Sequence, residues 1–532
     1  MNVADDHFKD LPPALQAYIR ELEDKAAASV RYQEQIAVLQ QRVDTLEEQF
    51  RLAQLKRFAP SSEKYGLQGC LFNEAEREDA AQAAETPAQT DSSEEPAARH
   101  KKPGRKPLPA HLPRQRIEHD LPESDKVCSC CHGALHRIGE ETTEQLDIVP
   151  AKVVVLEHVR FKYGCRQCER HGETSKIVTS PMPAQPIPGS IASPSTLATV
   201  MTAKYADGMP LYRQQAALER SDVPVVRGTL GNWCIKGGKL LSPLYAALHN
   251  VLLSHPIIHG DETTVQVLKE SGRSAQSTSY MWVYRTAEGS EQPVVLFEYQ
   301  AGRGHVHPKR FLNGYRGTVM TDGYAAWRML EGVTHLGCMA HARRRFDEAL
   351  KAQKNPTGRA KEGLDFIRKL YRIEAQARGK PPEGMTVAEH TYRLRQEKSR
   401  PILDAFHAWL VEHNAAVLPK TLIGDAISYA LKQWQYLVRY IDDGRAPIDN
   451  NLIERDIRPF TTGRKAWLFS DSVAGADASA IIYSLMLTCR ACGVEPYAYL
   501  RHVFTALPQR QPGCDLTDLL PFNYAKATTT GK

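Results

Sequence analysis

Two aspartates stand where buried strands are predicted. Asp261 follows the apolar run Ile257–Gly260, and Asp322 follows Val319–Thr321. We expect these two strands to be neighbours in a mixed sheet, which would bring both carboxylates to one spot. Buried carboxylates are costly unless a cation offsets their charge, so the pair predicts a site for Mg²⁺, which prefers oxygen ligands. Two such ions roughly 4 Å apart can activate an attacking oxygen and stabilise the leaving oxygen of a phosphodiester.

A third acid is expected from a helix that packs on this sheet, and Glu454 is the candidate. Glu454 and Arg458 lie one helical turn apart and share a face, which suits a site for metal and phosphate together. Asp456 points elsewhere on the same helix. Because Glu454 comes three residues after Asn451, a capping pair at a helix start is the alternative.

The two aspartates also have other interpretations. Asp322 precedes Gly323, and Asp-Gly at a strand end is a common turn signal. Glu262 could replace Asp261 as the ligand, because side-chain alternation along a strand places only one of them on a given face.

Basic residues cluster around these acids and are expected to contact DNA phosphates. One group comes shortly after His341 and the other follows Glu454 along the chain; they are Arg343, Arg344, Arg455, Arg458, Arg464 and Lys465.

Two CxxC pairs, Cys128 with Cys131 and Cys165 with Cys168, are separated by 33 residues. Four thiolates in two such pairs predict one closed, structural Zn²⁺ site. Cys130 and His132 are spare ligands nearby.

Two further cysteine motifs are weaker. Cys489 and Cys492 lie in a helical pattern without a second pair close in sequence, which favours core packing. Cys338 and His341 form a CxxH motif after a strand. They could bind a metal together, but a packed cysteine and a surface histidine is the preferred interpretation.

The elements that must position these residues predict a multidomain α+β protein. Three strand-like runs are followed by strand–helix units, in the order of an RNase H-like α/β core with helices on both faces. We assign residues 254–351 to the first part of this core, 352–445 to a helical insertion and 446–506 to its C-terminal helices.

The rest of the chain divides by composition. Residues 15–57 carry an apolar seam at alternating steps of three and four, which predicts a coiled coil; a single helix packed on its own chain is the alternative. Residues 58–116 form a flexible linker with a basic end, 117–180 the zinc-binding module, and 190–250 a helical DNA-binding segment. Within that segment, helix, break and helix resemble a helix-turn-helix, although an ordinary helical hairpin fits equally. Residues 507–532 are expected to be a tail of loop.

The chain has 532 residues and a net charge of +6, which permits but does not establish nucleic-acid binding. Its polar start predicts no signal peptide, and its apolar runs are shorter than the roughly 20 residues of a membrane helix. We therefore expect a cytoplasmic protein.

Several stretches resemble transposases of the insertion sequence sixty-six family over nearly the whole chain. They are Pro186-Ile-Pro-Gly-Ser-Ile-Ala-Ser-Pro-Ser, Pro210-Leu-Tyr-Arg-Gln, His259-Gly-Asp-Glu-Thr, Cys338-Met-Ala-His-Ala-Arg-Arg, Asp449-Asn-Asn-Leu-Ile-Glu-Arg-Asp-Ile-Arg-Pro and Gly463-Arg-Lys-Ala-Trp-Leu-Phe. The N-terminal seam and the CxxC pairs are also similar to the family's. Met339 departs from its pattern, where an aromatic residue is common.

The resemblance implies a bacterial transposase of the DDE type with Asp261, Asp322 and Glu454 as catalytic acids. It implies cleavage at transposon ends and transfer of the freed 3′-OH into target DNA. We expect two catalytic Mg²⁺ ions, which Mn²⁺ can replace, and one structural Zn²⁺. The expected partners are DNA, further copies of the chain in a homodimer or higher oligomer, and small accessory proteins of the same element. The rival functions are a nuclease without strand transfer and a non-catalytic, zinc-dependent DNA-binding regulator.

Overall fold

The computed structural model describes residues 12–58, 153–163, 178–353, 358–418 and 420–530. The chain forms two compact units, one of residues 1–84 with 181–532 and one of residues 85–180.

In the unit of residues 85–180, β1 (Lys162–Tyr163) pairs antiparallel with β2 (Val178–Thr179). The apolar run of residues 153–163 predicts a longer strand, but only its last two residues pair. The first four side chains of the run, at 153–156, are all more than half exposed. A run of apolar residues gains little from extended structure unless another layer covers it, and the described residues of this unit provide none.

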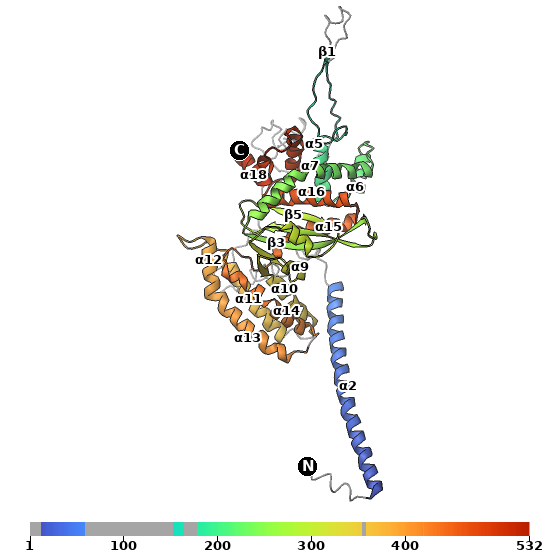
Figure 1. The fold of residues 1–532 in the computed structure, drawn as a ribbon, viewed down its shortest axis with the longest axis vertical. Helices are drawn as coiled ribbons and strands as arrows, with labels where there is room; N and C mark the ends of the chain where they lie inside the picture. The colour runs from blue at the N-terminus through green and yellow to red at the C-terminus, as the bar shows by residue number, and fades with distance from the viewer. Residues whose placement is uncertain (1–11, 59–152, 164–177, 354–357, 419, 531–532) are drawn as a thin grey trace, which may run out of the picture. The chain divides into compact units, whose positions relative to one another are not determined.

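The other unit is built on a mixed sheet whose strand order is β5-β4-β3-β6-β7 (Figure 1). The strands are β3 (Ile257–Lys269), β4 (Thr278–Thr286), β5 (Val295–Gln300), β6 (Thr318–Thr321) and β7 (Thr334–Gly337). The first three are antiparallel to one another, whereas β3, β6 and β7 run parallel. The sequence predicted both this order of elements and the contact between β3 and β6.

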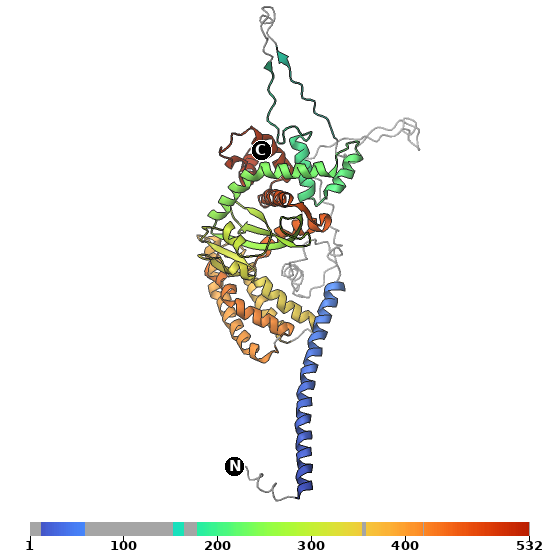
Figure 2. The ribbon, with the colours of Figure 1, turned by 45° about the vertical axis from the view of Figure 1, so that its right-hand side comes forward.

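Two hydrophobic cores cover the two faces of the sheet. Successive residues of β3 point to opposite faces, so Ile257 packs into one core and Ile258 into the other. Figure 2 shows the arrangement from a second side, with α7 and the C-terminal helices across the sheet from the yellow and orange helices. Strands buried on both faces explain why these segments appear in the sequence as continuous apolar runs.

The first core contains helices that precede and follow the sheet in the chain. They are α5 (Pro194–Tyr205), α7 (Arg227–Ser254), α16 (Val473–Ala491) and α17 (Pro496–Ala506). The hydroxyl groups of Ser484 and Thr488 on α16 accept hydrogen bonds from backbone N–H groups of β5, at 2.8 and 3.0 Å. These bonds seat α16 on the edge strand.

The helical break predicted within residues 190–250 is present. It separates α6 (Leu211–Glu219) from α7, and Asp222 adopts a positive φ of 56° in it. Asparagine and aspartate tolerate this left-handed conformation better than most residues, which is why the break falls there.

The second face carries α10 (Met339–Ala352) and the helices of residues 352–445. These helices are α11 (Arg359–Ala377), α12 (Val387–Leu394), α13 (Arg400–Ala416) and α14 (Leu422–Leu437). A buried pair between Arg395 and Glu374, 2.6 Å apart, joins the π-helical turn Arg395–Ser399 to α11. After the insertion the chain returns to the sheet in α15 (Asn451–Trp467), and β8 (Ser470–Ser472) pairs with the far end of β3.

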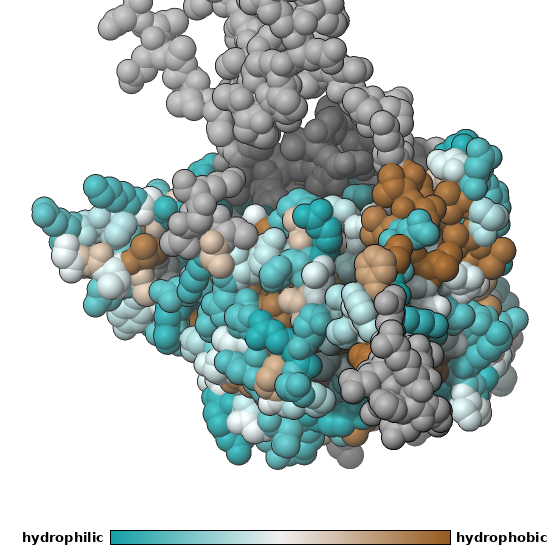
Figure 3. All heavy atoms as spheres, turned by 90° about the horizontal axis from the view of Figure 1, so that it is seen from above, coloured by the Kyte–Doolittle hydropathy of each residue, from teal (hydrophilic) through white to brown (hydrophobic). Residues whose placement is uncertain are grey.

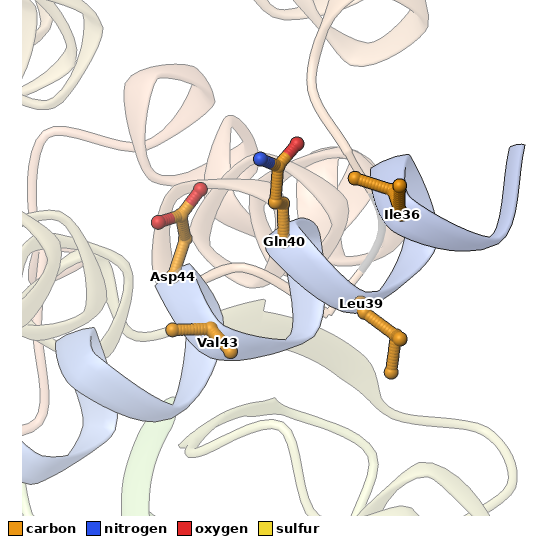
Figure 4. Close-up of a pocket in the computed structure, with 5 residues that line it drawn as sticks. All are labelled: Ile36, Leu39, Gln40, Val43 and Asp44. Atoms are coloured by element: carbon orange, nitrogen blue, oxygen red, sulfur yellow. The ribbon is translucent and has the colours of Figure 1, made fainter. Parts of the chain in front are cut away.

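Helix α2 (Pro13–Phe58) is the predicted N-terminal helix. Its seam is uncovered, because Ile36, Leu39 and Val43 are 54%, 61% and 54% exposed. Figure 4 shows these residues around a shallow pocket that Gln40 and Asp44 also line. At these three residues the seam does not pack on the rest of the chain, so the alternative of a helix covered by its own chain is wrong there.

The C-terminal segment corrects the predicted loop. It contains a short 3₁₀ turn (Thr517–Leu519) and α18 (Pro521–Thr530), and Leu519, Leu520 and Phe522 are buried. Three apolar side chains that anchor in the core are enough to order the segment.

On the surface, the face in Figure 3 is mainly hydrophilic, with one area where hydrophobic side chains gather. Among the described residues, the helices are too short or too polar to be candidates for a membrane span.

Candidate active site

Strand β3 presents Asp261 and Glu262 in different surroundings. The Glu262 carboxylate accepts hydrogen bonds from Arg303 Nε at 2.8 Å, Arg303 Nη2 at 2.5 Å and Trp327 Nε1 at 2.8 Å. The Asp261 carboxylate accepts a bond from the backbone N–H of Glu262 at 2.8 Å. Because the Glu262 carboxylate already bonds a guanidinium and an indole, Asp261 is the better candidate for a metal ligand.

Asp322 directly follows β6 and takes part in the turn that its sequence suggested. Its Oδ1 accepts a hydrogen bond from the backbone N–H of Tyr324 at 2.9 Å. This bond holds the carboxylate at the end of β6, next to β3 in the sheet.

Glu454 lies in the first turn of α15, but the capping alternative is wrong. The N-cap is Asn450, which makes no side-chain cap bond, and Glu454 is the fourth helical residue rather than the third. Its Oε2 accepts a hydrogen bond from Arg344 Nη2 at 3.4 Å.

Asn450, which the sequence did not single out, ties α15 to β3. It is fully buried, and its Nδ2 donates to Gly260 O at 3.0 Å. Its Oδ1 accepts from His259 Nδ1 at 2.8 Å, which fixes the histidine tautomer. Burial lowers the pKa of His259 to about 4, so this ring is neutral near pH 7. An asparagine before a helix is usually a cap, and only the contact with β3 reveals its other role.

Burial and neighbouring charges raise the pKa values of two of the three acids, Asp261 and Glu454. The pKa of Asp261 is raised well above its ordinary value, first by burial and then by the charges of Glu262, Glu454 and Asp322. The pKa of Glu454 is raised to about 7, mainly by burial, against the opposing charges of Arg344 and Arg458. Partly buried carboxylates that repel each other are stabilised by a bound cation.

His341 corrects the prediction of a surface histidine. Its side chain is only 25% exposed, and its Nδ1 lies 3.9 Å from Glu454 Oε1. Burial lowers its pKa to about 4. Cys338 is fully packed, as expected, and its Sγ accepts a hydrogen bond from the Asn450 backbone at 3.2 Å.

Some of the basic residues predicted to contact phosphate are buried or bonded to the protein itself. Arg343 is only 4% exposed and lies over the Tyr371 ring, so it is not available to a phosphate. Arg344 is directed to Glu454, and Arg464 donates to Thr263 and Thr264 of β3.

The remaining residues of α15 differ in exposure. Arg455 and Arg458 are partly exposed and Lys465 is exposed. Asp456 forms a buried ion pair with Arg285, which agrees with its exclusion from the acids.

One of the cysteine predictions is confirmed, and another falls outside the described residues. Cys489 is buried and Cys492 partly buried among the helices of the first core, which confirms core packing. Cys128, Cys131, Cys165 and Cys168 lie outside the described residues.

Four sequence models of protein families match the chain. The one described as "Transposase IS66 family" matches residues 189–478 and thus includes Asp261, Asp322 and Glu454. The "zinc-finger binding domain of transposase IS66" matches 125–169, a range that spans both CxxC pairs. The "IS66 C-terminal element" matches 484–522, and "Transposase C of IS166 homeodomain" matches 45–117.

Similar proteins occur in Sinorhizobium fredii (strain NBRC 101917 / NGR234). Uncharacterized protein y4hP is 29% identical over 515 residues, which cover 93% of this chain and 90% of the relative. Uncharacterized protein y4jD is 32% identical over 441 residues, 80% of this chain and 83% of the relative. Uncharacterized protein y4qI is 32% identical over 443 residues, 80% and 79%.

The matched family explains why buried acids, a zinc-finger region and a terminal element occur together in one chain. It implies a DNA-processing enzyme with DNA as its partner and a need for divalent metal. The chain belongs to the IS66 family of transposases.

Proposed function

We propose that this protein is a DDE transposase that cleaves DNA at transposon ends and joins the freed 3′-OH to target DNA. Asp261, Asp322 and Glu454 are its catalytic acids. The observation that carries the proposal is that Asp261 is buried on β3 and carries a raised pKa, to which the charges of Glu454 at the start of α15 and of Asp322 at the end of β6 contribute. Raised pKa values at a clustered site are typical of functional carboxylates.

The donor set fits magnesium. All three ligands are carboxylate oxygens, and both Asp261 and Glu454 have raised pKa values that a nearby cation would lower. Two Mg²⁺ ions held there would activate the attacking oxygen and stabilise the leaving oxygen of the phosphodiester. Mn²⁺ shares the preference for oxygen ligands and would substitute.

The chain's own residues hold this arrangement in place. Asn450 fixes the start of α15 against His259 and Gly260, directly before Asp261. Arg344 orients one Glu454 oxygen. Arg455, Arg458 and Lys465 would contact DNA phosphates, whereas Arg464 positions α15 on β3.

The order of the sheet supports an RNase H-like core. Three antiparallel strands followed by two parallel ones place the first strand next to the fourth. Acids on these two strands would therefore lie close together, and a helix that packs on the sheet would supply the third. We also propose that the helices of residues 352–445, which come before α15, are an insertion in this core.

The parts before the core would bind DNA and pair subunits. We assign end recognition to the zinc module, with one structural Zn²⁺ at Cys128, Cys131, Cys165 and Cys168, and to the α6–α7 segment. The exposed seam of α2 would pair with a second copy in a coiled coil.

The deciding experiment is metal-dependent cleavage of DNA that carries the element's own ends. We expect wild-type protein to cut with Mg²⁺ or Mn²⁺ and to yield joined product, while Glu454→Gln and Asp261→Ala bind the ends but do not cut. Loss of one catalytic carboxylate is expected to reduce the rate by about a thousandfold or more. Glu412→Gln, at an exposed position of α13, is the matched control and should cut normally.

The other outcomes identify the rivals. Cutting without joined product would indicate a nuclease without strand transfer. End binding without any metal-dependent cutting, even with the element's accessory proteins added, would indicate a DNA-binding regulator. An active Asp261→Ala protein would refute the assignment of the acids.

A further inference from the structure

Three side chains of different chemistry converge beside the proposed catalytic site. Single ligand atoms of Cys338, His341 and Glu454 all lie within 4.8 Å of one another. Cys338 and His341 come from the junction of β7 with α10, and Glu454 from the first turn of α15. This compact group includes Glu454 but neither of the aspartates.

Two atoms of the group are buried without a hydrogen-bond partner in the described structure, His341 Nδ1 and Glu454 Oε1. Glu454 is only 9% exposed, so water does not readily satisfy its free oxygen. Buried polar atoms are nearly always paired, and an exception calls for an explanation such as an ion. Both atoms belong to one group, which points to a common ligand.

The backbone holds the group together. The Cys338 Sγ accepts a hydrogen bond from the N–H of Asn450, and the Met339 N–H donates to Ile448 O at 3.1 Å. The segment that carries the thiol and the imidazole is thereby joined to the segment that leads into α15. Ligands on two joined, buried segments are preorganised for metal binding.

The donor set selects the metal. Sulfur, nitrogen and oxygen ligands together suit Zn²⁺, which commonly takes three protein ligands and one open position. Mg²⁺ prefers oxygen alone and is poorly matched by a thiolate and an imidazole. The cluster therefore differs in class from the all-carboxylate site that shares Glu454.

We propose that Cys338, His341 and Glu454 form a second metal site, for Zn²⁺ or a similar borderline-soft divalent cation, and that its occupation inhibits catalysis. When the metal–sulfur bond forms, the thiol of Cys338 releases its proton to solvent. Glu454 is then withdrawn from the magnesium site. Binding at the cluster stands on its geometry alone, whereas inhibition rests on the proposed role of Glu454.

Binding is tested by the absorption of Co²⁺, whose bond to a thiolate gives a charge-transfer band. The full-length protein is isolated with Zn²⁺ bound to its zinc-finger region, and one equivalent of Co²⁺ is then added. We expect the band in wild type and in Cys489→Ala, a buried cysteine outside the group, and its loss in Cys338→Ala. His341→Gln, which keeps the thiol and its backbone bond, should weaken Co²⁺ binding by about tenfold or more. A band of equal strength in Cys338→Ala, or no band in wild type, would overturn the site.

Inhibition is tested by adding Zn²⁺ to the magnesium-dependent cleavage reaction. We expect the Zn²⁺ concentration for half inhibition to rise about tenfold or more in His341→Gln, relative to that variant's own rate without Zn²⁺. An unchanged concentration would refute the inhibitory role. If no cleavage is seen under any condition, the proposed function fails, while the Co²⁺ band still decides whether the metal site exists.

Discussion

At the scale of single residues, Glu454 is subject to opposing influences. Burial raises its pKa to about 7, while Arg344 and Arg458 favour its charged form. The residues next to Glu454 in the sequence made it a candidate, but they do not reveal which groups surround its carboxylate. One of these groups is Arg344, which is 110 residues away in the chain.

The raised pKa of Glu454 gives a prediction for metal-free protein. A carboxyl group whose pKa is higher in the folded than in the unfolded chain binds more protons when folded, so stability falls as pH rises between the two values. For Glu454 this window extends from its ordinary pKa of 4.5 to about 7. Glu454→Gln carries no charge and should escape this loss.

We therefore expect Glu454→Gln to match wild type near the acid end of this window. Above it, the variant should be more stable by on the order of 3 kcal/mol. Urea titrations in the presence of a chelator measure this difference, and added Mg²⁺ should reduce it by binding wild type. If the unfolding free energies of the two proteins changed with pH in the same way, the charge of Glu454 would not destabilise the folded protein.

At the scale of elements, apolar runs and breaks in the sequence were informative where local pattern decides the structure. The strands from 256 to 339 and the break before α7 were predicted for this reason. Helix α18 was missed because its order depends on Leu519, Leu520 and Phe522 reaching a distant core. The pairing of Asn450 with β3 was missed because it joins residues 190 and more apart in the chain.

The contact between α7 and α16 gives the second prediction. A Cβ atom added at Gly238 of α7 would lie 2.7 Å from Ala478 Cβ and 2.8 Å from its Cα, which is closer than packed atoms allow. Gly238→Ala should therefore lower the free energy of unfolding by about 1–3 kcal/mol, despite the better helix propensity of alanine. The matched control is Gly228→Ala in the same helix, where nothing lies within 4 Å.

The control should be neutral or more stable by up to about 1 kcal/mol. Both variants are compared with wild type by urea titration. Equal stability of Gly238→Ala and Gly228→Ala would mean that the two helices can separate without cost.

At the scale of the whole molecule, the seam of α2 predicts how copies of the chain associate. The sequence left two interpretations open, and the exposure of Ile36, Leu39 and Val43 removes the covered one for these residues. Pairing with a second copy remains a prediction. Burying a leucine side chain contributes about 1.5–3 kcal/mol, so a seam of several such residues can hold a dimer.

We expect light scattering after gel filtration to give a dimer or larger assembly for wild type. Placing lysines in the seam, Leu39→Lys with Leu46→Lys, should yield a smaller species, because charges at these positions cannot be buried. Ala37→Lys with Gln41→Lys adds the same charge away from the seam and should keep the assembly. The same mass for both double variants would contradict the coiled coil.

The position of α15 has a consequence for synthesis of the protein. The ribosome releases Asp261 and Asp322 long before Glu454, because the whole helical insertion is translated between them. A nascent or prematurely terminated chain that ends within the insertion would therefore carry the zinc-finger region but lack the third acid and the helices that pack on α7. If the zinc-finger region binds transposon ends as proposed, such a fragment would occupy them without cutting, and incomplete translation would itself limit how often the element moves.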